Sequence, residues 1–256
     1  MQWNPEQYHV FSRERIQPAL DLVALIRPRP AMRVIDLGCG SGEVTALLAQ
    51  RLPGALVEGI DASEAMLARS ARHAGARVTF RHADIADVHD YRAYDLVFSN
   101  AALQWVPNNE TVMRHILGTL RPGAQVAVQV PANEQHPSHR IADELAQEPP
   151  FRDLLGGFVR RSEALSLERY AALLREHSFH EHVCFEKVYE HELPGTRAVV
   201  EWVKGSSLNA YLARLDAPAR ARFLSVYTER LLHELGDTAP YVYPFRRLFF
   251  WGRKSG

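Results

Sequence analysis

The segment Val34–Gly42 constrains the fold of this chain more than any other part of the sequence. An apolar run that carries the acidic residue Asp36 leads directly into three glycines at alternate positions, Gly38, Gly40 and Gly42. Glycine lets the backbone turn sharply and approach a ligand closely. Because an amphipathic helix is predicted from Glu43 onward, the segment predicts a strand, a ligand-binding turn and a helix.

The spacing of these glycines indicates what kind of ligand the turn accepts. A dinucleotide site requires G-x-G-x-x-G, but here the third glycine, Gly42, comes one position early and Glu43 follows it. A carboxylate close to a helix N-terminus repels a pyrophosphate. The loop therefore favours a nucleoside-like ligand without phosphates and disfavours an NAD-dependent oxidoreductase.

Strands and helices alternate through the first half of the chain. The predicted strands cover residues 33–37, 55–60, 78–82, 94–99 and 125–130. Helices are predicted between them, at 43–52, after Ser63 as N-cap, and at 109–120. This alternation predicts a parallel sheet whose ligands lie at the carboxyl ends of the strands.

The pattern changes after Pro131. We expect helical pieces at 137–147 and 166–176, a strand at 182–193, short helices within 196–215, a longer helix from Asp216 to Gly236, and a terminal strand at 246–253. We interpret residues 1–256 as a single domain. Its donor-binding βαβ core is predicted at 30–131, with helical acceptor-side insertions at 132–180 and 194–240.

The glycine loop resembles the first motif of class I S-adenosylmethionine-dependent methyltransferases, D/E-x-G-x-G-x-G. The resemblance implies an α/β, Rossmann-like sheet that is mostly parallel with an antiparallel last strand, helices on both faces and a helical acceptor-side cap. S-adenosyl-L-methionine is the implied cofactor and S-adenosyl-L-homocysteine its product. The implied donor-binding residues are Asp36, Gly38, Cys39, Gly40, Asp61, Ala62, Asp84, Ile85, Asn100 and Ala101.

These donor residues have distinct expected roles. Asp61 ends the second strand, where a carboxylate can accept both ribose hydroxyls. The resemblance places Asp84 at the adenine amino group, the next residue on the base, and Asn100 with Ala101 beside the methionine part. Asp36 is expected to orient the loop and the donor ammonium.

Further segments resemble the trans-aconitate methyltransferase family, and the similarity runs nearly end to end. They are Trp3…Gln7-Tyr8…Phe11…Arg15, Asn100-Ala101…Gln104-Trp105-Val106-Pro107, Gln129-Val130-Pro131, Glu201-Trp202-Val203-Lys204-Gly205, Tyr211-Leu212 and Pro244-Phe245-Arg246-Arg247-Leu248-Phe249. The resemblance implies methyl ester formation on a carboxylate of a small polycarboxylic acid such as trans-aconitate.

A carboxylate acceptor is already ionised at neutral pH, so no general base is required. We therefore expect no catalytic residue beyond those that position the acceptor. Its remaining carboxylates require cations, and arginine binds carboxylates bidentately. The predicted acceptor residues are Tyr8, Arg15, Gln104, Trp105, Gln129, Lys204, Tyr211 and Arg246. Arg247 is a further candidate for binding these carboxylates. Because two adjacent residues on a strand point to opposite faces, we expect at most one of Arg246 and Arg247 to enter the pocket. Asn133, His139 and Tyr241 are additional candidates.

Composition excludes several classes of function. The 30 basic and 30 acidic residues give a formal net charge of zero, so neither nucleic acid nor a membrane is an expected partner. Two cysteines and dispersed histidines predict no metal site. The absence of a signal-peptide pattern favours a cytoplasmic enzyme, which we expect to be a monomer or a weak homodimer.

Two alternatives remain open. The chain could methylate a hydroxyl or amine of another small metabolite. A neutral hydroxyl needs a base, which would make His139 important. It could also be a binding protein that keeps the donor pocket without turnover.

Overall fold

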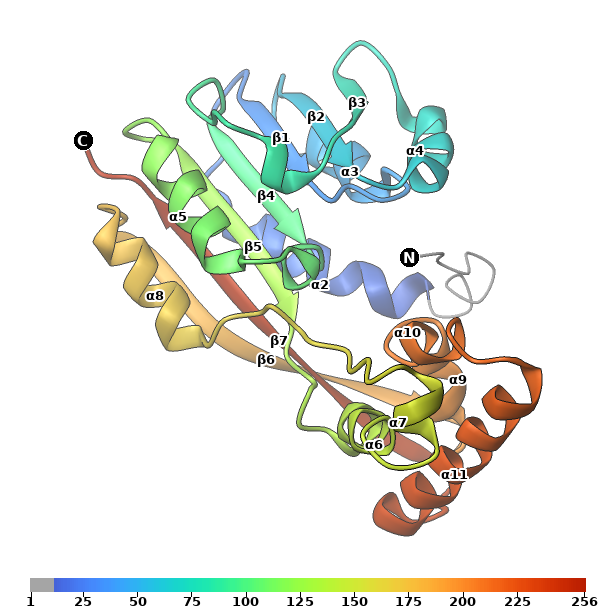
Figure 1. The fold of residues 1–256 in the computed structure, drawn as a ribbon. Helices are drawn as coiled ribbons and strands as arrows, with labels where there is room; N and C mark the ends of the chain where they lie inside the picture. Colours follow the sequence, from blue (N-terminus) through green and yellow to red (C-terminus); the bar gives the residue numbers. More distant parts are fainter. Residues whose placement is uncertain (1–11) are drawn as a thin grey trace. The chain divides into compact units, whose positions relative to one another are not determined.

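The computed structural model describes residues 12–256 (Figure 1). Their strands form a seven-stranded sheet in the order β3-β2-β1-β4-β5-β7-β6. The strands are β1 (Arg33–Leu37), β2 (Leu56–Asp61), β3 (Val78–His82), β4 (Leu96–Asn100), β5 (Gln125–Pro131), β6 (Glu181–Leu193) and β7 (Tyr241–Arg253).

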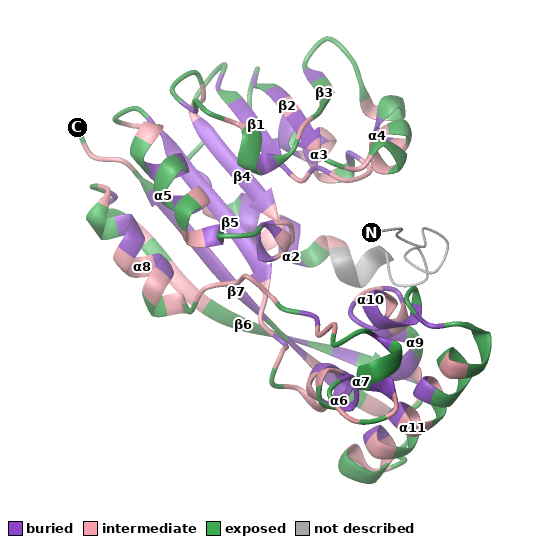
Figure 2. Ribbon diagram, viewed as in Figure 1, coloured by how far each residue is buried: buried purple, intermediate pink, exposed green. Residues whose placement is uncertain are grey.

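The strand directions confirm the predicted fold class. Neighbouring strands from β3 to β5 pair in parallel, whereas β7 pairs antiparallel to β5, with Gln129 opposite Phe249 and Pro131 opposite Arg247. Parallel strands covered on both faces are apolar throughout. Accordingly, β4 and β5 are buried along nearly their whole length (Figure 2).

The chain divides into two compact units. The sheet unit comprises residues 16–131, 163–187 and 247–256. The helical unit comprises residues 132–162 and 188–246, together with residues 12–15. Strands β6 and β7 each contribute residues to both units. The predicted single domain with two helical insertions stays a prediction.

The sheet unit contains α-helices and 3-10 helices, among them those predicted at 43–52, after Ser63, at 109–120 and at 166–176. They are α2 (Ser12–Leu25), α3 (Glu43–Arg51), α4 (Glu64–Ser70), α5 (Asn109–Thr119) and α8 (Leu167–Glu176), with the 3-10 helices η1 (Ala71–His73), η2 (Ile85–Asp87) and η3 (Leu103–Trp105). Ser63 caps α4 as predicted, because its side chain accepts a hydrogen bond from the amide of Met66. Helices α5 and α8 lie side by side (Figure 1), joined by the ion pair of Arg114 with Glu176.

The helical unit has its own core. It contains α6 (Pro137–Leu145), α7 (Phe151–Leu154), α9 (Ala198–Lys204), α10 (Asn209–Leu212) and α11 (Ala217–Leu235). The helix predicted from Asp216 is present as α11, and Asp216 caps it by accepting from the amide of Ala219. Aromatic side chains dominate the interior: Phe151 and Phe223 meet edge to face, and Tyr211 stacks on Phe223.

The predicted start of the terminal strand needs correction. The terminal strand was expected at 246–253, but β7 begins at Tyr241. Pro244 interrupts the strand pattern in the sequence, because proline cannot donate a hydrogen bond to a neighbouring strand. Within the described residues, no helix has the length and apolarity needed to cross a membrane.

Candidate functional site

The glycine loop between β1 and α3 forms one side of the candidate site. The amides of Gly38 and Cys39 both donate to the carbonyl of Ile60, each over 2.9 Å. Gly38 has a φ of 72°, and a Cβ there would lie 2.3 Å from the Cβ of Ala102. Gly40 has a φ of 55°, but its Cβ would meet only the Cε of Met66, at 3.3 Å. Gly38 is therefore required for packing, whereas Gly40 leaves backbone accessible beside the loop.

Asp61, at the carboxyl end of β2, faces this loop. Its Oδ2 accepts from the amide of Gly40 over 2.8 Å, and its Oδ1 accepts from the amide of Ser63 over 2.8 Å. An ionised carboxylate has about four acceptor positions, so both oxygens retain capacity for ligand hydroxyls. The arrangement fits a sugar diol next to the glycine loop.

Asp36 lies beneath the loop as a buried carboxyl. The hydroxyl of Thr45 donates to its Oδ2 over 2.6 Å. Burial raises the pKa of Asp36 to about 7, against the lowering effect of that hydrogen bond. Burial, followed by the nearby charges of Asp36 and Asp61, also raises the pKa of Cys39, so its thiol stays protonated and is a poor nucleophile.

The loop after β3 presents a polar and an apolar residue side by side. Asp84 is exposed, and its Oδ1 accepts from the amide of Ala86 over 2.9 Å, which caps η2. Ile85 is buried. Ala62, after β2, is exposed, and its carbonyl lies 3.0 Å from Nε2 of His82. An exposed acceptor next to an apolar side chain fits the edge and face of a base.

The carboxyl ends of β4 and β5 meet at a strained residue that sequence patterns did not reveal. Ala101 has a φ of 57°, in the left-handed region that side chains disfavour. Its amide donates to the carbonyl of Gln129 over 2.9 Å, and its carbonyl accepts from Nε2 of Gln104 over 2.7 Å. Such strain persists where the surroundings hold it, and it gathers at ligand sites.

Three buried polar atoms surround Ala101. Oδ1 of Asn100, Oε1 of Gln104 and Nε2 of Gln129 have no hydrogen-bond partner among the residues that the structure describes. Because Asn100 lies opposite Gln129 in the register of β4 and β5, these amides share one end of the sheet. Buried polar groups are normally satisfied, so this cluster fits a polar ligand beyond the ends of β4 and β5.

The two adjacent arginines of β7 separate as their alternation predicts. Arg246 is exposed, and its amide donates to Oδ1 of Asn133 over 3.0 Å. Arg247 is buried, and its guanidinium donates to Oε1 of Gln129 over 3.2 Å. The predicted acceptor residue was Arg246, and that assignment stays a prediction. The arginine that is buried and contacts Gln129 is Arg247.

The other predicted acceptor residues have varied surroundings. In the helical unit, Lys204 pairs with Glu201 over 2.6 Å, and Tyr211 is buried, with its hydroxyl donating to Oδ1 of Asp143 over 2.6 Å. In the sheet unit, Trp105 is half-buried at the end of η3. Tyr8 and the side chain of Arg15 lie outside the described residues, so their assignments also remain predictions.

The helical unit also holds polar groups that the sequence did not indicate. Arg160 is buried in the stretch between α7 and α8, where no periodic pattern marks it, and its guanidinium lies 3.5 Å from Oδ2 of Asp143. Its amide donates to the hydroxyl of Tyr211. His139 is buried beside Ser138, whose Oγ lies 3.0 Å from its Nδ1. Burial, then the charge of Arg160, lowers its pKa to about 3.

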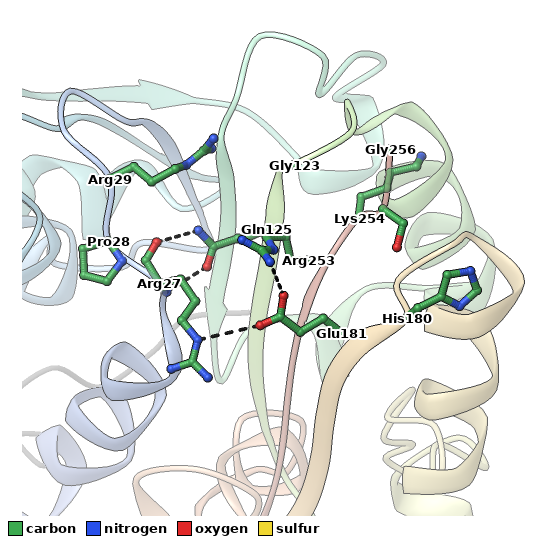
Figure 3. Close-up of a pocket in the computed structure, with 11 residues that line it drawn as sticks. Arg27, Pro28, Arg29, Gly123, Gln125, His180, Glu181, Arg253, Lys254 and Gly256 are labelled. Carbon is green, nitrogen blue, oxygen red and sulfur yellow. Dashed lines mark hydrogen bonds and ion pairs between the residues drawn. The ribbon is translucent and has the colours of Figure 1, made fainter.

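A cavity of about 660 Å³ lies elsewhere in the sheet unit. Figure 3 shows the residues that line it. Its lining residues come from the segment before β1, the start of β5 and the end of β7, which lie at the opposite edge of the sheet from the glycine loop. Glu181 pairs there with Arg27 and Arg253, and Lys254 donates to the carbonyl of Leu117 over 2.7 Å. These contacts stabilise the end of the sheet at which the parallel strands begin. We place the functional site at the other end, where the glycine loop follows β1.

Known proteins resemble this chain over most of its length. A family model described as a methyltransferase domain matches residues 28–171. A trans-aconitate 2-methyltransferase of Deinococcus radiodurans is 44% identical over 256 residues, covering 98% of this chain and 97% of the relative. A protein of the same name from Variovorax paradoxus is 40% identical, covering 100% of this chain and 99% of the relative.

Solved structures show the same fold at low sequence identity. The YcgJ protein of Bacillus subtilis has a TM-score of 0.60 at 14% identity, covering 94% of this chain and 99% of that protein. Phosphoethanolamine N-methyltransferase 2 of Haemonchus contortus, solved with S-adenosyl-L-methionine, has a TM-score of 0.55 at 20% identity, covering 94% of this chain and 53% of that protein. With the relatives matched over nearly their whole length, this chain belongs to the trans-aconitate 2-methyltransferase family of S-adenosylmethionine-dependent methyltransferases.

Proposed function

We propose that this protein transfers a methyl group from S-adenosyl-L-methionine to a carboxylate of trans-aconitate or a closely related polycarboxylic acid, forming a methyl ester. The observation that carries the proposal is the chain-long similarity to relatives named trans-aconitate 2-methyltransferase. That similarity includes the segments outside the glycine loop, where acceptor residues are expected.

The residues at the glycine-loop edge are suited to hold the donor. Asp61 would accept the ribose hydroxyls, with Gly40 allowing close approach of the sugar. Ile85 would pack on the adenine while Asp84 accepts from its amino group. Asp36 would act on the donor ammonium, and Asn100 with Ala101 would line the methionine part. Ala62, Gly38 and Cys39 would complete the wall of this pocket.

The chemistry then depends on positioning. When bound, S-adenosylmethionine supplies an activated methyl group, whose transfer to a carboxylate oxygen breaks the carbon–sulfur bond and leaves the electron pair on sulfur. No proton moves, because the carboxylate is already ionised at neutral pH. The protein must exclude water, hold the acceptor oxygen in line and balance the charges of the remaining carboxylates.

The structure offers an argument against a neutral hydroxyl acceptor. Such an acceptor needs a general base, and His139 is the candidate that the sequence suggested. With its pKa lowered to about 3, His139 is a weak base, because a base works best when its pKa lies near the working pH. This observation favours an acceptor that arrives already ionised.

An acceptor panel tests the proposal. The purified chain is given the donor with trans-aconitate, cis-aconitate, citrate, isocitrate, a phenol and a primary amine, and formation of S-adenosylhomocysteine is measured. We expect turnover with trans-aconitate and lower values of kcat/KM with its relatives. Turnover with the phenol or amine alone would refute the carboxylate proposal. Donor binding without any turnover would favour the binding-protein alternative.

We also propose that the working enzyme is a cytoplasmic monomer or weak homodimer, and that its partners are small molecules and neither nucleic acid nor membrane. The balanced formal charge supports this part of the proposal. Sedimentation of the protein at several concentrations measures the association state. A stable assembly at the lowest concentration would contradict it.

A further inference from the structure

The buried arginine of β7 is connected by hydrogen bonds to the end of β4. Arg247 pairs with Pro131 in the register of β5 and β7, and its guanidinium donates to Gln129, two residues earlier on β5. The carbonyl of Gln129 in turn accepts from the amide of Ala101. One continuous set of contacts therefore links Arg247 to the residues expected beside the methionine part of the donor.

The alternation of side chains places this set on one face of the sheet. Asn100 and Gln129 are register partners, as are Gln129 and Phe249, so their side chains share a face with Arg247. Phe249 stacks on Phe185 with the ring centroids 5.1 Å apart, so the position two residues after Arg247 on this face is apolar. A charged group with apolar neighbours interacts more strongly with an anion than it would in water.

The side chain on β5 that Arg247 contacts is the amide of Gln129. Gln129 accepts a hydrogen bond from the Arg247 guanidinium through its Oε1, over 3.2 Å. Its Nε2 is buried and has no hydrogen-bond partner among the described residues. Gln129 therefore offers an unsatisfied N–H donor beside the buried Arg247 guanidinium, and N–H donors next to a guanidinium suit a carboxylate.

We propose that Arg247, positioned by Gln129, binds one carboxylate of the acceptor that is not methylated, and that this contact selects polycarboxylic acids. The inference rests on the proposed function, because it requires a carboxylate acceptor. It assigns the binding of this carboxylate to Arg247, which is buried, and not to Arg246, which is exposed. The guanidinium fork suits a carboxylate bidentately, which a lysine ammonium cannot reproduce.

Kinetics of paired variants test the assignment. Arg247→Met should raise the KM for trans-aconitate roughly 10- to 100-fold, the usual effect of losing a hydrogen bond to a charged group. Arg247→Lys should recover only part of this loss. Gln129→Glu should also raise that KM, because the new carboxylate would occupy the arginine. Titration calorimetry should find the Kd for S-adenosylhomocysteine within about twofold of wild type in each case.

Two further variants act as comparisons. Arg253→Gln changes a cation on the same strand at the opposite sheet edge, where it pairs with Glu181, and should leave the KM for trans-aconitate unchanged. Arg246→Gln tests the exposed neighbour and should have a much smaller effect than Arg247→Met. A large effect of Arg246→Gln with none from Arg247→Met would overturn the proposal.

The three monoamides of trans-aconitate provide a readout that a structural role would not change. For wild type, the monoamide that lacks the carboxylate bound by Arg247 should lose kcat/KM. For Arg247→Met, that monoamide and trans-aconitate should react equally well. A uniform loss across trans-aconitate and all monoamides would overturn the proposal and leave the proposed function intact. If wild type methylates no polycarboxylate, both ideas fail, and wild type alone shows it.

Discussion

The amide of Gly40 donates to Oδ2 of Asp61 over 2.8 Å, so the acid that ends β2 is fixed against the glycine loop that follows β1. The amide of Ser63 fixes its other oxygen. This contact joins two segments about twenty residues apart in the sequence, the spacing at which nucleotide-binding α/β folds place a ribose acceptor.

Replacing this acid should weaken donor binding. Asp61→Ala should cost about 1–3 kcal/mol of binding free energy for S-adenosylhomocysteine, since the ribose would lose its acceptor. Calorimetric Kd values for wild type and variant measure the loss. Unchanged affinity, with the variant folded by circular dichroism, would remove Asp61 from the donor site.

Donor affinity should depend on pH through Asp36. With its pKa raised to about 7, Asp36 is partly protonated near neutrality, and the cationic donor favours the ionised form. Affinity should therefore rise between about pH 6 and pH 7.5. Asp36→Asn should bind the donor weakly and show a flatter pH profile. A wild-type profile as flat as that of the variant would contradict this role.

Thr45 should tune that transition. Its hydroxyl lowers the pKa of Asp36 by donating to the carboxylate. Thr45→Val should therefore move the midpoint of the affinity profile to higher pH. Measuring the donor Kd across the same pH series gives the midpoint, and a shift to lower pH would contradict the assignment.

Asp36 should also cost stability when it is ionised. Its folded pKa of about 7 lies above the ordinary value of 3.8, so the cost is absent below the ordinary value and complete above about pH 7. Asp36→Asn should raise the free energy of unfolding by about 2 kcal/mol near pH 8. The gain should shrink as the pH falls toward 4. Urea titrations at both pH values measure it, and an equal gain at both would contradict the burial argument.

The left-handed backbone of Ala101 predicts a stabilising substitution. Glycine adopts a positive φ without the steric cost that a Cβ imposes, so Ala101→Gly should be neutral or more stable by up to about 1 kcal/mol. Thermal unfolding measures the difference. Clear destabilisation by Ala101→Gly would mean that the methyl group has a packing role that outweighs the strain.

The buried histidine of the helical unit predicts sensitivity to acid. The pKa of His139 is lowered to about 3, so the unfolded chain binds a proton that the folded chain does not, and stability falls as the pH drops below about 6.5. Because of His139, the free energy of unfolding should fall by about 2 kcal/mol between neutral pH and about pH 5. His139→Asn should flatten the dependence of unfolding on pH in that range. An equally steep dependence in the variant would assign the sensitivity to other groups.

The donor side of the fold could be predicted because local signals agree there. The glycines, the acid that ends β2 and the cap at Ser63 each follow from one short segment. The parallel sheet follows from the alternation of helices and strands. Even there, the strained backbone of Ala101 was not predicted, because it depends on a hydrogen bond that it accepts from Gln104 and one that it donates to Gln129, which only the assembled sheet provides.

The acceptor side depends on long-range contacts and was harder to predict. Alternation on β7 placed the two arginines on opposite faces, but only the pairing of β5 with β7 shows that Arg247 is the buried one. Arg160 lies in a stretch without periodicity, so nothing in the sequence marks it as buried. Its contacts with Asp143 and Tyr211 arise from the fold of the helical unit.

The identity of the product tests the central claim most directly. The protein is incubated with S-adenosylmethionine and trans-aconitate, and the product is analysed by mass spectrometry before and after mild alkaline hydrolysis. The account predicts an acid heavier by one CH2 group that alkali converts back to trans-aconitate, as a methyl ester must. A product that survives alkali, or methylation of no polycarboxylate by a protein that binds the donor, would contradict it.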